Sequence, residues 1–171
     1  LIEASYLFNR PSKEIDIIIH PQSIVHSMVE YIDGSILAQL GSPDMRTPIS
    51  YSMAWPDRIN AHVDRLDLTA TDSLSFFKPD LHKFPALNLA RFALETGGTA
   101  PCVINAVNEV AVDAFLQDKI EFLDITRLID RVLEKYSSRA DFKIEMSTIE
   151  EVISKDNEVR KIATENIKKL I

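Results

Sequence analysis

The chain has 171 residues, of which 46% are hydrophobic and 26% are charged, so it is able to bury a core as one domain or as one domain with a small partner. Its formal net charge of -7 and pI of about 5.1 disfavour nucleic acid and anionic membranes as partners, because the average field repels phosphate. A single cysteine, Cys102, excludes an internal disulfide, and no apolar run approaches the roughly 20 residues that cross a bilayer. We therefore expect a cytoplasmic protein with no nucleic-acid or membrane partner.

Residues 1–8 have a helical pattern but no start signal. No capping residue precedes Leu1, and the chain does not begin with methionine. The basic start and the cleavage site of a signal peptide are also missing from these residues. We therefore expect the chain to be the carboxy-terminal part of a longer enzyme, without a complete active site of its own.

The next part of the chain is rich in β-structure. Residues 14–19 form a β-branched run that predicts a buried strand, ended by His20-Pro21. Asp33-Gly34 lies between two apolar arms and predicts a hairpin with a two-residue turn.

That turn would set the register of the hairpin. It would place Val29 opposite Ala38 and give a core face of Tyr31, Val29, Ile36, Ala38 and Leu40. The other face, His26, Met28, Glu30, Leu37 and Gln39, is too apolar for solvent and too polar for a core. We expect it to meet a site, a cofactor or a partner subunit.

The remainder of the chain is predicted to be helical. A short helix is expected from about Pro48 to Trp55, and residues 61–81 form a connection. Beyond residue 82 the hydrophobic period changes from 2 to 3.6. Four helices are expected there, two of which start at signals in the sequence: an N-cap at Asp124, and a capping box at 147–150 whose helix is interrupted near 154–156. The fold class is therefore α+β, with a helical bundle at the end.

Few residues carry recognisable chemistry. The four glycines form neither a G-x-G-x-x-G turn nor a P-loop. His20 and His26 would be roughly 20 Å apart along an extended strand, which is too far for one metal ion. A hydrolase using Ser23 or Ser27 with His26 is disfavoured, because no G-x-S-x-G elbow and no orienting carboxylate are near.

Two features of the predicted helices remain open. Cys102 lies in a first helical turn, where helix packing is favoured over a reactive thiol because no basic residue flanks it. Asn105, Asn108 and Glu109 form a polar stripe, which is either a solvated face or a surface that docks onto another domain. Docking is favoured, since the neighbouring segments are apolar.

Several strings of residues resemble one family. They are Ile19-His-Pro-Gln-Ser-Ile-Val-His-Ser-Met-Val29, the hairpin turn at Asp33-Gly34, Ala38-Gln-Leu-Gly41, Pro43-Asp-Met-Arg-Thr-Pro-Ile49, Met53-Ala-Trp-Pro56 and Asn105-Ala-Val-Asn-Glu109. In this order they resemble the 1-deoxy-D-xylulose 5-phosphate reductoisomerases, from Leu1 to Ile171.

The resemblance implies a homodimeric enzyme that isomerises a small phosphorylated sugar and reduces it with NADPH, using Mg²⁺ or Mn²⁺. By resemblance, residues 1–60 are the end of a mixed-sheet catalytic and dimerisation domain, 61–81 a connection and 82–171 a helical domain. The family's carboxylate metal ligands have no match here, and the last of them would fall immediately before Leu1.

The same resemblance assigns roles to a few residues. His26 matches an active-site histidine near the substrate, and Ser23 a supporting hydrogen-bonding group. Pro43, Asp44 and Met45 match a loop that forms a wall beside substrate and nicotinamide. The competing interpretations are that these residues only order the floor of the site or fill a core, and that the chain is a noncatalytic dimerisation or interaction module.

Overall fold

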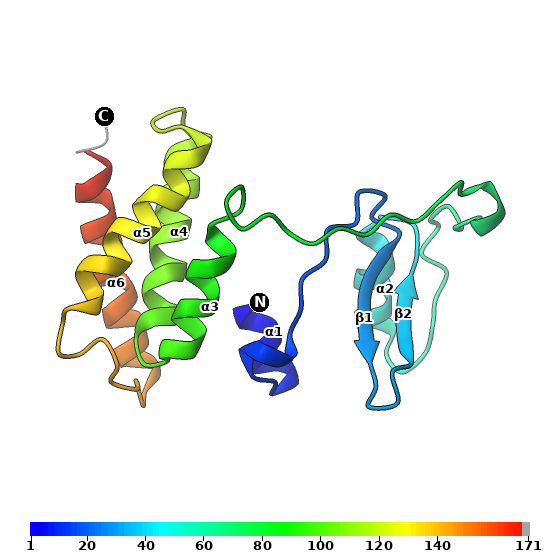
Figure 1. Cartoon of the computed structure of the whole chain (residues 1–171), viewed down its shortest axis with the longest axis horizontal. Helices are drawn as coiled ribbons and strands as arrows, with labels where there is room; N and C mark the ends of the chain where they lie inside the picture. Colours follow the sequence, from blue (N-terminus) through cyan, green and yellow to red (C-terminus); the bar gives the residue numbers. More distant parts are fainter. Residues whose placement is uncertain (169–171) are drawn as a thin grey trace. The chain divides into compact units, whose positions relative to one another are not determined.

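The computed structural model describes residues 1–168 (Figure 1). The chain divides into two compact units. Unit 1 contains Leu1–Asp16 and Asp80–Ile171, and unit 2 contains Ile17–Pro79. One unit is helical and the other carries the hairpin, so the predicted α+β class is confirmed.

Within residues 1–168, unit 1 has five α-helices and one 3₁₀ turn. In chain order they are α1 (Ile2–Phe8), η1 (Ser12–Glu14), α3 (Ala86–Thr96), α4 (Ala100–Leu116), α5 (Phe122–Ser137) and α6 (Ile149–Ile167). The four long helices lie close to their predicted positions. None of the helices within residues 1–168 combines the length and the apolar character needed to cross a bilayer.

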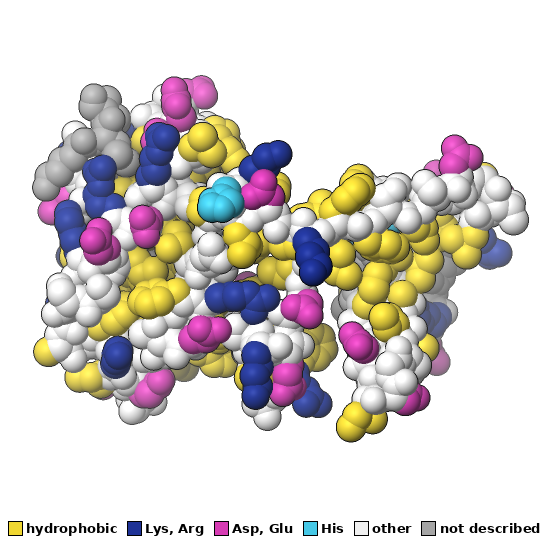
Figure 2. Space-filling view, in the orientation of Figure 1, with side chains coloured by type: hydrophobic (Ala, Val, Ile, Leu, Met, Phe, Trp, Pro, Cys, Tyr) yellow, Lys and Arg dark blue, Asp and Glu magenta, His cyan; other side chains and the backbone are white. Residues whose placement is uncertain are grey.

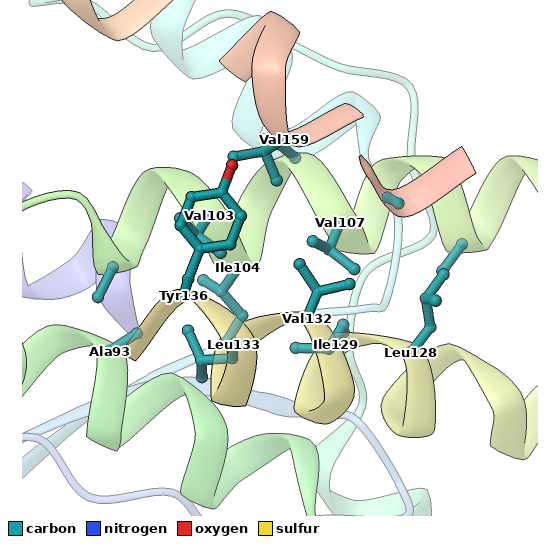
Figure 3. Packing of buried hydrophobic residues seen from close by; sticks show 14 of the residues in the cluster. Ala93, Val103, Ile104, Val107, Leu128, Ile129, Val132, Leu133, Tyr136 and Val159 are labelled. Carbon is teal, nitrogen blue, oxygen red and sulfur yellow. The ribbon is translucent and has the colours of Figure 1, made fainter. Parts of the chain in front are cut away.

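The core of unit 1 lies between α4, α5 and α6. Its largest fully buried side chains come from these helices and from the loop that follows α5: Tyr136, Phe142, Leu128, Val103, Val107, Val132 and Val159. Most of them interlock in Figure 3. Since complete burial of a Val or Leu side chain contributes about 1.5–3 kcal/mol, this cluster is the main source of stability in the unit.

The start of α5 differs from the prediction. Asp124 is not the N-cap, because the helix begins one turn earlier with Glu121 as its cap. The Asp124 carboxylate instead accepts a hydrogen bond from the backbone N–H of Glu121, at 3.0 Å, within a capping box. The reciprocal pair satisfies amides of the first turn, so the helix extends to Phe122.

The last helix also differs in two details. Its cap is Thr148 paired with Glu151, one residue beyond the predicted box. The interruption predicted near 154–156 is wrong, since α6 runs unbroken to Ile167. Asp156 pairs with Arg160 and Lys155 pairs with Glu158 along the same helix. These pairs span one helical turn and support a continuous helix.

The first residues of the chain belong to unit 1. Ile2 packs against the helical core, and α1 contacts α3. Asn9 ends α1 in the left-handed conformation, with φ of 50°. Contacts therefore group residues 1–16 with the helices, whereas the family resemblance implies one domain for residues 1–60.

Unit 2 contains the strands β1 (Val25–Glu30) and β2 (Ile36–Leu40), the helix α2 (Arg46–Ala54) and the 3₁₀ turn η2 (Leu68–Ala70). The predicted buried strand at 14–19 is not formed. Only Ile19 makes a bridge, exchanging two backbone hydrogen bonds of 2.9 Å with Phe77. Glu14 is the last residue of the 3₁₀ turn η1, and residues 15–18 pair with no strand among the described residues.

The hairpin is present, but its predicted register is wrong. Val29 pairs with Leu37, and Met28 pairs with Ala38. Glu30 pairs with Ile36 and the Tyr31 N–H donates to the Ser35 carbonyl at 2.9 Å, so the loop has three residues, 32–34. Within this loop only Gly34 adopts positive φ, at 82°, whereas a two-residue type I′ turn needs positive φ at both central positions. Asp33 uses its carboxylate to accept hydrogen bonds from the Ser35 N–H and hydroxyl.

Unit 2 has no buried residue among residues 17–79. The predicted core face of the hairpin is therefore wrong, since all of its members are exposed. Large apolar side chains such as Leu37, Met53 and Trp55 are 63%, 81% and 68% exposed. Figure 2 shows hydrophobic side chains spread over the visible face of this unit.

Candidate functional site

The candidate site residues all lie in unit 2, close to a bulge in the hairpin. Val25 pairs with Leu40 and Ser27 pairs with Gln39, so His26 is the extra residue between two successive pairs. Bulges re-aim a side chain and occur often beside functional sites. The register of β1 thus gives His26 an orientation that a regular strand would not.

The bulge brings His26 beside the start of the candidate loop. A Cβ built on Gly41 would lie 4.0 Å from His26 Cε1. The Gly41 N–H donates to the carbonyl of Ile24 at 3.0 Å, which closes the open end of the hairpin. The histidine and the segment that leads into Pro43, Asp44 and Met45 are therefore brought together.

Ser23 lies in the turn that leads into β1, two residues before Val25. Its N–H donates to the His20 carbonyl at 3.1 Å, in a turn that contains Pro21. Ser23 is exposed and has a φ of 50°. A non-glycine residue in this conformation is uncommon and costs free energy, so the turn is held by its surroundings.

Asp44 is the most strongly held residue of the loop. Its carboxylate accepts hydrogen bonds from the Arg46 backbone N–H, Nε and Nη2, the last at 2.6 Å. Arg46 holds the pKa of Asp44 below its usual range, chiefly through these side-chain hydrogen bonds. The ionised Asp44 carboxylate is therefore fully engaged with Arg46 of the same loop.

Arg46 also fastens the loop to a distant segment. Its Nη1 donates to the His62 carbonyl at 3.0 Å, and the Ser42 hydroxyl donates to the Asp64 carbonyl at 2.8 Å. No spacing in the sequence signals either contact. The sequence interpretation therefore missed Arg46, although the bidentate chemistry of arginine beside Asp44 was a usable hint.

Met45 and Pro43 are presented outward by this loop. Met45 precedes α2 at its N-cap position and is 71% exposed, and Pro43 is exposed as well. A flexible thioether in an open position is suited to contact an apolar ring. The core-filling alternative for Met45 does not apply to the described residues.

A second polar cluster, also missed by the sequence interpretation, surrounds His20. Its ring stacks on Phe76 with centroids 4.6 Å apart, and its Nδ1 lies 2.8 Å from the Ser75 carbonyl. The Gln22 amide donates to the Ser75 hydroxyl at 3.1 Å. The cluster joins the segment before β1 to residues 75–77 and so braces the turn that contains Ser23.

The described residues do not offer a metal site. Among residues 1–168, no group of three or more His, Cys, Asp or Glu side chains is placed to hold a metal ion. Asp44, the acidic candidate, is neutralised by Arg46. Residues 1–168 by themselves therefore do not supply a set of ligands for a divalent cation.

The structure shows the surroundings of Cys102 and of the polar stripe formed by Asn105, Asn108 and Glu109. Cys102 lies 3.8 Å from the Val152 carbonyl, and burial raises the pKa of its thiol, so it is a packing residue. On the polar stripe, Asn105 donates to Glu109 at 3.0 Å. Glu109 also accepts from Arg160 of α6 at 2.6 Å, so part of the stripe serves to join two helices.

Known proteins resemble the chain over nearly all of its length. Residues 40–162 match the family model described as the DXP reductoisomerase C-terminal domain. The chain belongs to the DXP reductoisomerase family. A 1-deoxy-D-xylulose 5-phosphate reductoisomerase of Rhodospirillum centenum is 50% identical over 167 residues, which cover 98% of this chain and 40% of that protein. One from Cupriavidus pinatubonensis is 62% identical over 135 residues, or 79% of this chain and 34% of that protein.

Solved reductoisomerase structures share the fold. The Zymomonas mobilis enzyme in complex with NADPH has a TM-score of 0.85 and 47% identity over 96% of this chain and 42% of the other. A reductoisomerase in complex with NADPH, fosmidomycin and magnesium has a TM-score of 0.87 and 46% identity over 98% of this chain and 42% of the other. The chain therefore spans about 40% of the length of the relatives it matches.

Proposed function

We propose that the chain is the carboxy-terminal portion of a 1-deoxy-D-xylulose 5-phosphate reductoisomerase. The whole protein would isomerise deoxyxylulose phosphate and reduce the product with NADPH to 2-C-methyl-D-erythritol 4-phosphate, in the non-mevalonate isoprenoid route. The observation that carries the proposal is 50% identity to a reductoisomerase over 98% of the chain. A cytoplasmic location stays a prediction.

NADPH and Mg²⁺ or Mn²⁺ belong to the proposal as ligands of the whole protein. Solved relatives contain NADPH and magnesium. The four glycines of this chain form no dinucleotide-binding turn, and its described carboxylates form no metal cluster. We therefore assign both ligands mainly to residues outside this chain.

Within this chain, we assign contact with the sugar phosphate to His26, supported by Ser23. The bulge at His26 and its approach to Gly41 favour this assignment. His26 would hold a hydroxyl or phosphate oxygen through an imidazole nitrogen, while Met45 and Pro43 form an apolar wall beside the cofactor ring. Asp44, paired with Arg46, keeps that wall in place.

The test is turnover by the whole protein, followed as NADPH oxidation with deoxyxylulose phosphate and Mg²⁺. His26→Ala should lower kcat/KM by roughly 10- to 100-fold, the effect of losing one hydrogen bond to a charged group. The matched control is His62→Asn, which removes an exposed imidazole of the same unit while keeping a residue that tolerates the φ of 51° found there. Equal losses in both variants would contradict the role of His26.

We also propose that the whole protein is a homodimer and that the hairpin contributes to its interface. All of β2 is exposed, and Val29 and Leu37 are 56% and 63% exposed. A two-stranded sheet with apolar faces and two open edges is a surface that proteins normally cover. Sedimentation velocity should show Leu37→Lys weakening the dimer at least about tenfold, the effect of one unpaired charge at an interface.

The control for that experiment is Leu116→Lys, which changes an equally open leucine, 73% exposed, in the helical unit. It should leave the dimer intact. The competing hypothesis of a noncatalytic interaction module accepts the dimer but predicts no NADPH-dependent activity in the whole protein. The turnover assay therefore decides between the two.

A further inference from the structure

Arg91 of α3 binds the segment that leads from α1 toward the hairpin unit. Its Nη1 donates to the Ser12 carbonyl at 2.8 Å and to the Ser12 hydroxyl at 3.1 Å. Its Nη2 donates to the Ile15 carbonyl at 2.9 Å. The guanidinium thus holds the carbonyls at both ends of the 3₁₀ turn η1.

The attachment of this segment depends on polar contacts. Ser12 is only 6% exposed, whereas its neighbours Pro11 and Lys13 are exposed. No carboxylate of the described residues forms an ion pair with Arg91. Its guanidinium donates instead to the oxygens of Ser12 and Ile15. Hydrogen bonds from a charged donor are stronger than neutral ones, and the planar guanidinium fixes their direction.

The same helix is connected to both points at which the chain passes between the units. The chain leaves unit 1 after Asp16, one residue beyond Ile15, and returns at Asp80. At the return point, Asp80 accepts hydrogen bonds from the backbone N–H groups of His82 and Lys83, and α3 begins at Ala86. Arg91 is therefore the link from α3 to the outgoing segment.

We propose that Arg91 is a positioning residue, which fixes the point where the chain carrying Ser23 and His26 leaves the helical unit. The kinetic part of this inference rests on the proposed reductoisomerase function. While Arg91 binds Ser12 and Ile15, a larger fraction of molecules has a conformation that is competent to bind substrate. Loss of these hydrogen bonds lowers that fraction and so raises the apparent KM, while kcat at saturating substrate is preserved.

The experiment uses the whole protein with three substitutions. Arg91→Met keeps an apolar stem and removes every donor, and Arg91→Lys keeps the charge without the planar fork. Arg10→Met is the matched control, because Arg10 lies on the same segment in an exposed pair with Glu14, at 3.4 Å. For each protein, kcat and KM for deoxyxylulose phosphate are measured, together with amide hydrogen exchange of residues 10–18.

We expect Arg91→Met to raise KM roughly threefold to tenfold with kcat unchanged within about twofold. Exchange should become faster at residues 10–18 and stay unchanged in α4 and α5. Arg91→Lys should fall between Arg91→Met and the unaltered protein, and Arg10→Met should match the unaltered protein.

Two results would overturn the inference. One is an unchanged KM with unchanged exchange at residues 10–18. The other is a loss of kcat with unchanged KM and faster exchange throughout the helices, which marks a general loss of folding. An unaltered whole protein without turnover rejects the proposed function instead, and exchange at residues 10–18 then decides by itself whether Arg91 fixes the exit point.

Discussion

Arg160 of α6 and Glu109 of α4 form an ion pair in which Nη2 lies 2.6 Å from Oε2. Arg160 also binds Asp156 one turn earlier in α6, and Glu109 also accepts from Asn105. Four side chains therefore form one chain of hydrogen bonds across two packed helices. Two residues of the polar stripe of α4, Asn105 and Glu109, therefore connect α4 to α6.

Glu109→Gln should weaken the acid dependence of folding. Arg160 holds the pKa of Glu109 below its ordinary value of 4.5, chiefly by side-chain hydrogen bonding. Since the folded pKa is the lower one, the ionised Glu109 stabilises the protein fully above about pH 4.5 and progressively less as the pH falls through the folded value. The variant should be less stable than the parent at pH 7 and similar to it in acid.

The measurement is urea unfolding followed by far-UV circular dichroism, at pH 7 and at a pH below the folded value. Glu134→Gln is the control, because Glu134 is an exposed residue of α5. If both variants show the same pH dependence, the link between α4 and α6 has no energetic role.

Tyr136→Phe should leave stability nearly unchanged, although the side chain is 2% exposed. Its hydroxyl is buried without a hydrogen-bond partner among the described residues. Burial, followed by the charge of Glu158, raises the pKa of Tyr136 to about 12, so the hydroxyl stays neutral. Glu158 is near, but the geometry of the two groups does not make a hydrogen bond.

Removing the hydroxyl loses no bond, so we expect a change of less than about 1 kcal/mol in the free energy of unfolding, whereas Tyr136→Ala should cost about 3–5 kcal/mol. Urea unfolding monitored by far-UV circular dichroism measures both. A cost above about 2 kcal/mol for Tyr136→Phe would reveal a hydrogen bond to the hydroxyl.

Gly98→Ala should be far more destabilising than Gly34→Ala, although both glycines have positive φ. A Cβ on Gly98 would lie 2.5 Å from the Lys143 carbonyl carbon and 2.8 Å from the Phe142 carbonyl oxygen, whereas nothing lies within 4 Å at Gly34. Left-handed strain alone costs about 1–2 kcal/mol, and forced backbone shifts add about 1–3 kcal/mol.

Far-UV circular dichroism reports the effect of Gly98→Ala in the helical unit. The fluorescence of Trp55, the single tryptophan of the chain, reports Gly34→Ala in the hairpin unit. Similar costs at the two positions would contradict the close approach of residues 142–143 to Gly98.

Thr148→Ala should cost about 0.5–2 kcal/mol, while Ser147→Ala should be close to neutral. The Thr148 hydroxyl accepts from the Glu151 N–H at 3.2 Å, and the Glu151 carboxylate accepts from the Thr148 N–H at 3.1 Å. Thermal unfolding of the two variants distinguishes this cap from the one that the sequence predicts at Ser147. A larger loss for Ser147→Ala would restore the predicted box.

The positions of the helices beyond residue 82 were predictable because the hydrophobic period is a signal within each segment. The change of hydrophobic period from 2 to 3.6 beyond residue 82 depends on local spacing alone. The caps were less predictable, since Asp124 and Glu150 are chemically suited to several cap positions and packing selects one of them. The hairpin register failed for a similar reason, because Asp33 had a competing use for its carboxylate in binding Ser35.

The sequence could propose only those parts of the candidate site that are continuous in the chain. Pro43, Asp44 and Met45 were singled out from one string, and His26 was brought beside Gly41 by a hairpin whose turn is visible in the sequence. The contacts of His20 with Ser75, of Arg46 with His62 and of Arg91 with Ser12 join distant segments. Such pairs have no spacing rule, so a single sequence does not reveal them.

The division of the chain has a practical consequence for shortening the protein. A cut at residue 82, where the helical pattern begins, would discard Ile2 from the flank of the core and all three oxygens that Arg91 binds. The helical unit is discontinuous in sequence, with the hairpin unit inserted between its two parts. A truncated protein that preserves the unit must therefore retain residues 1–16 and replace 17–79 with a linker.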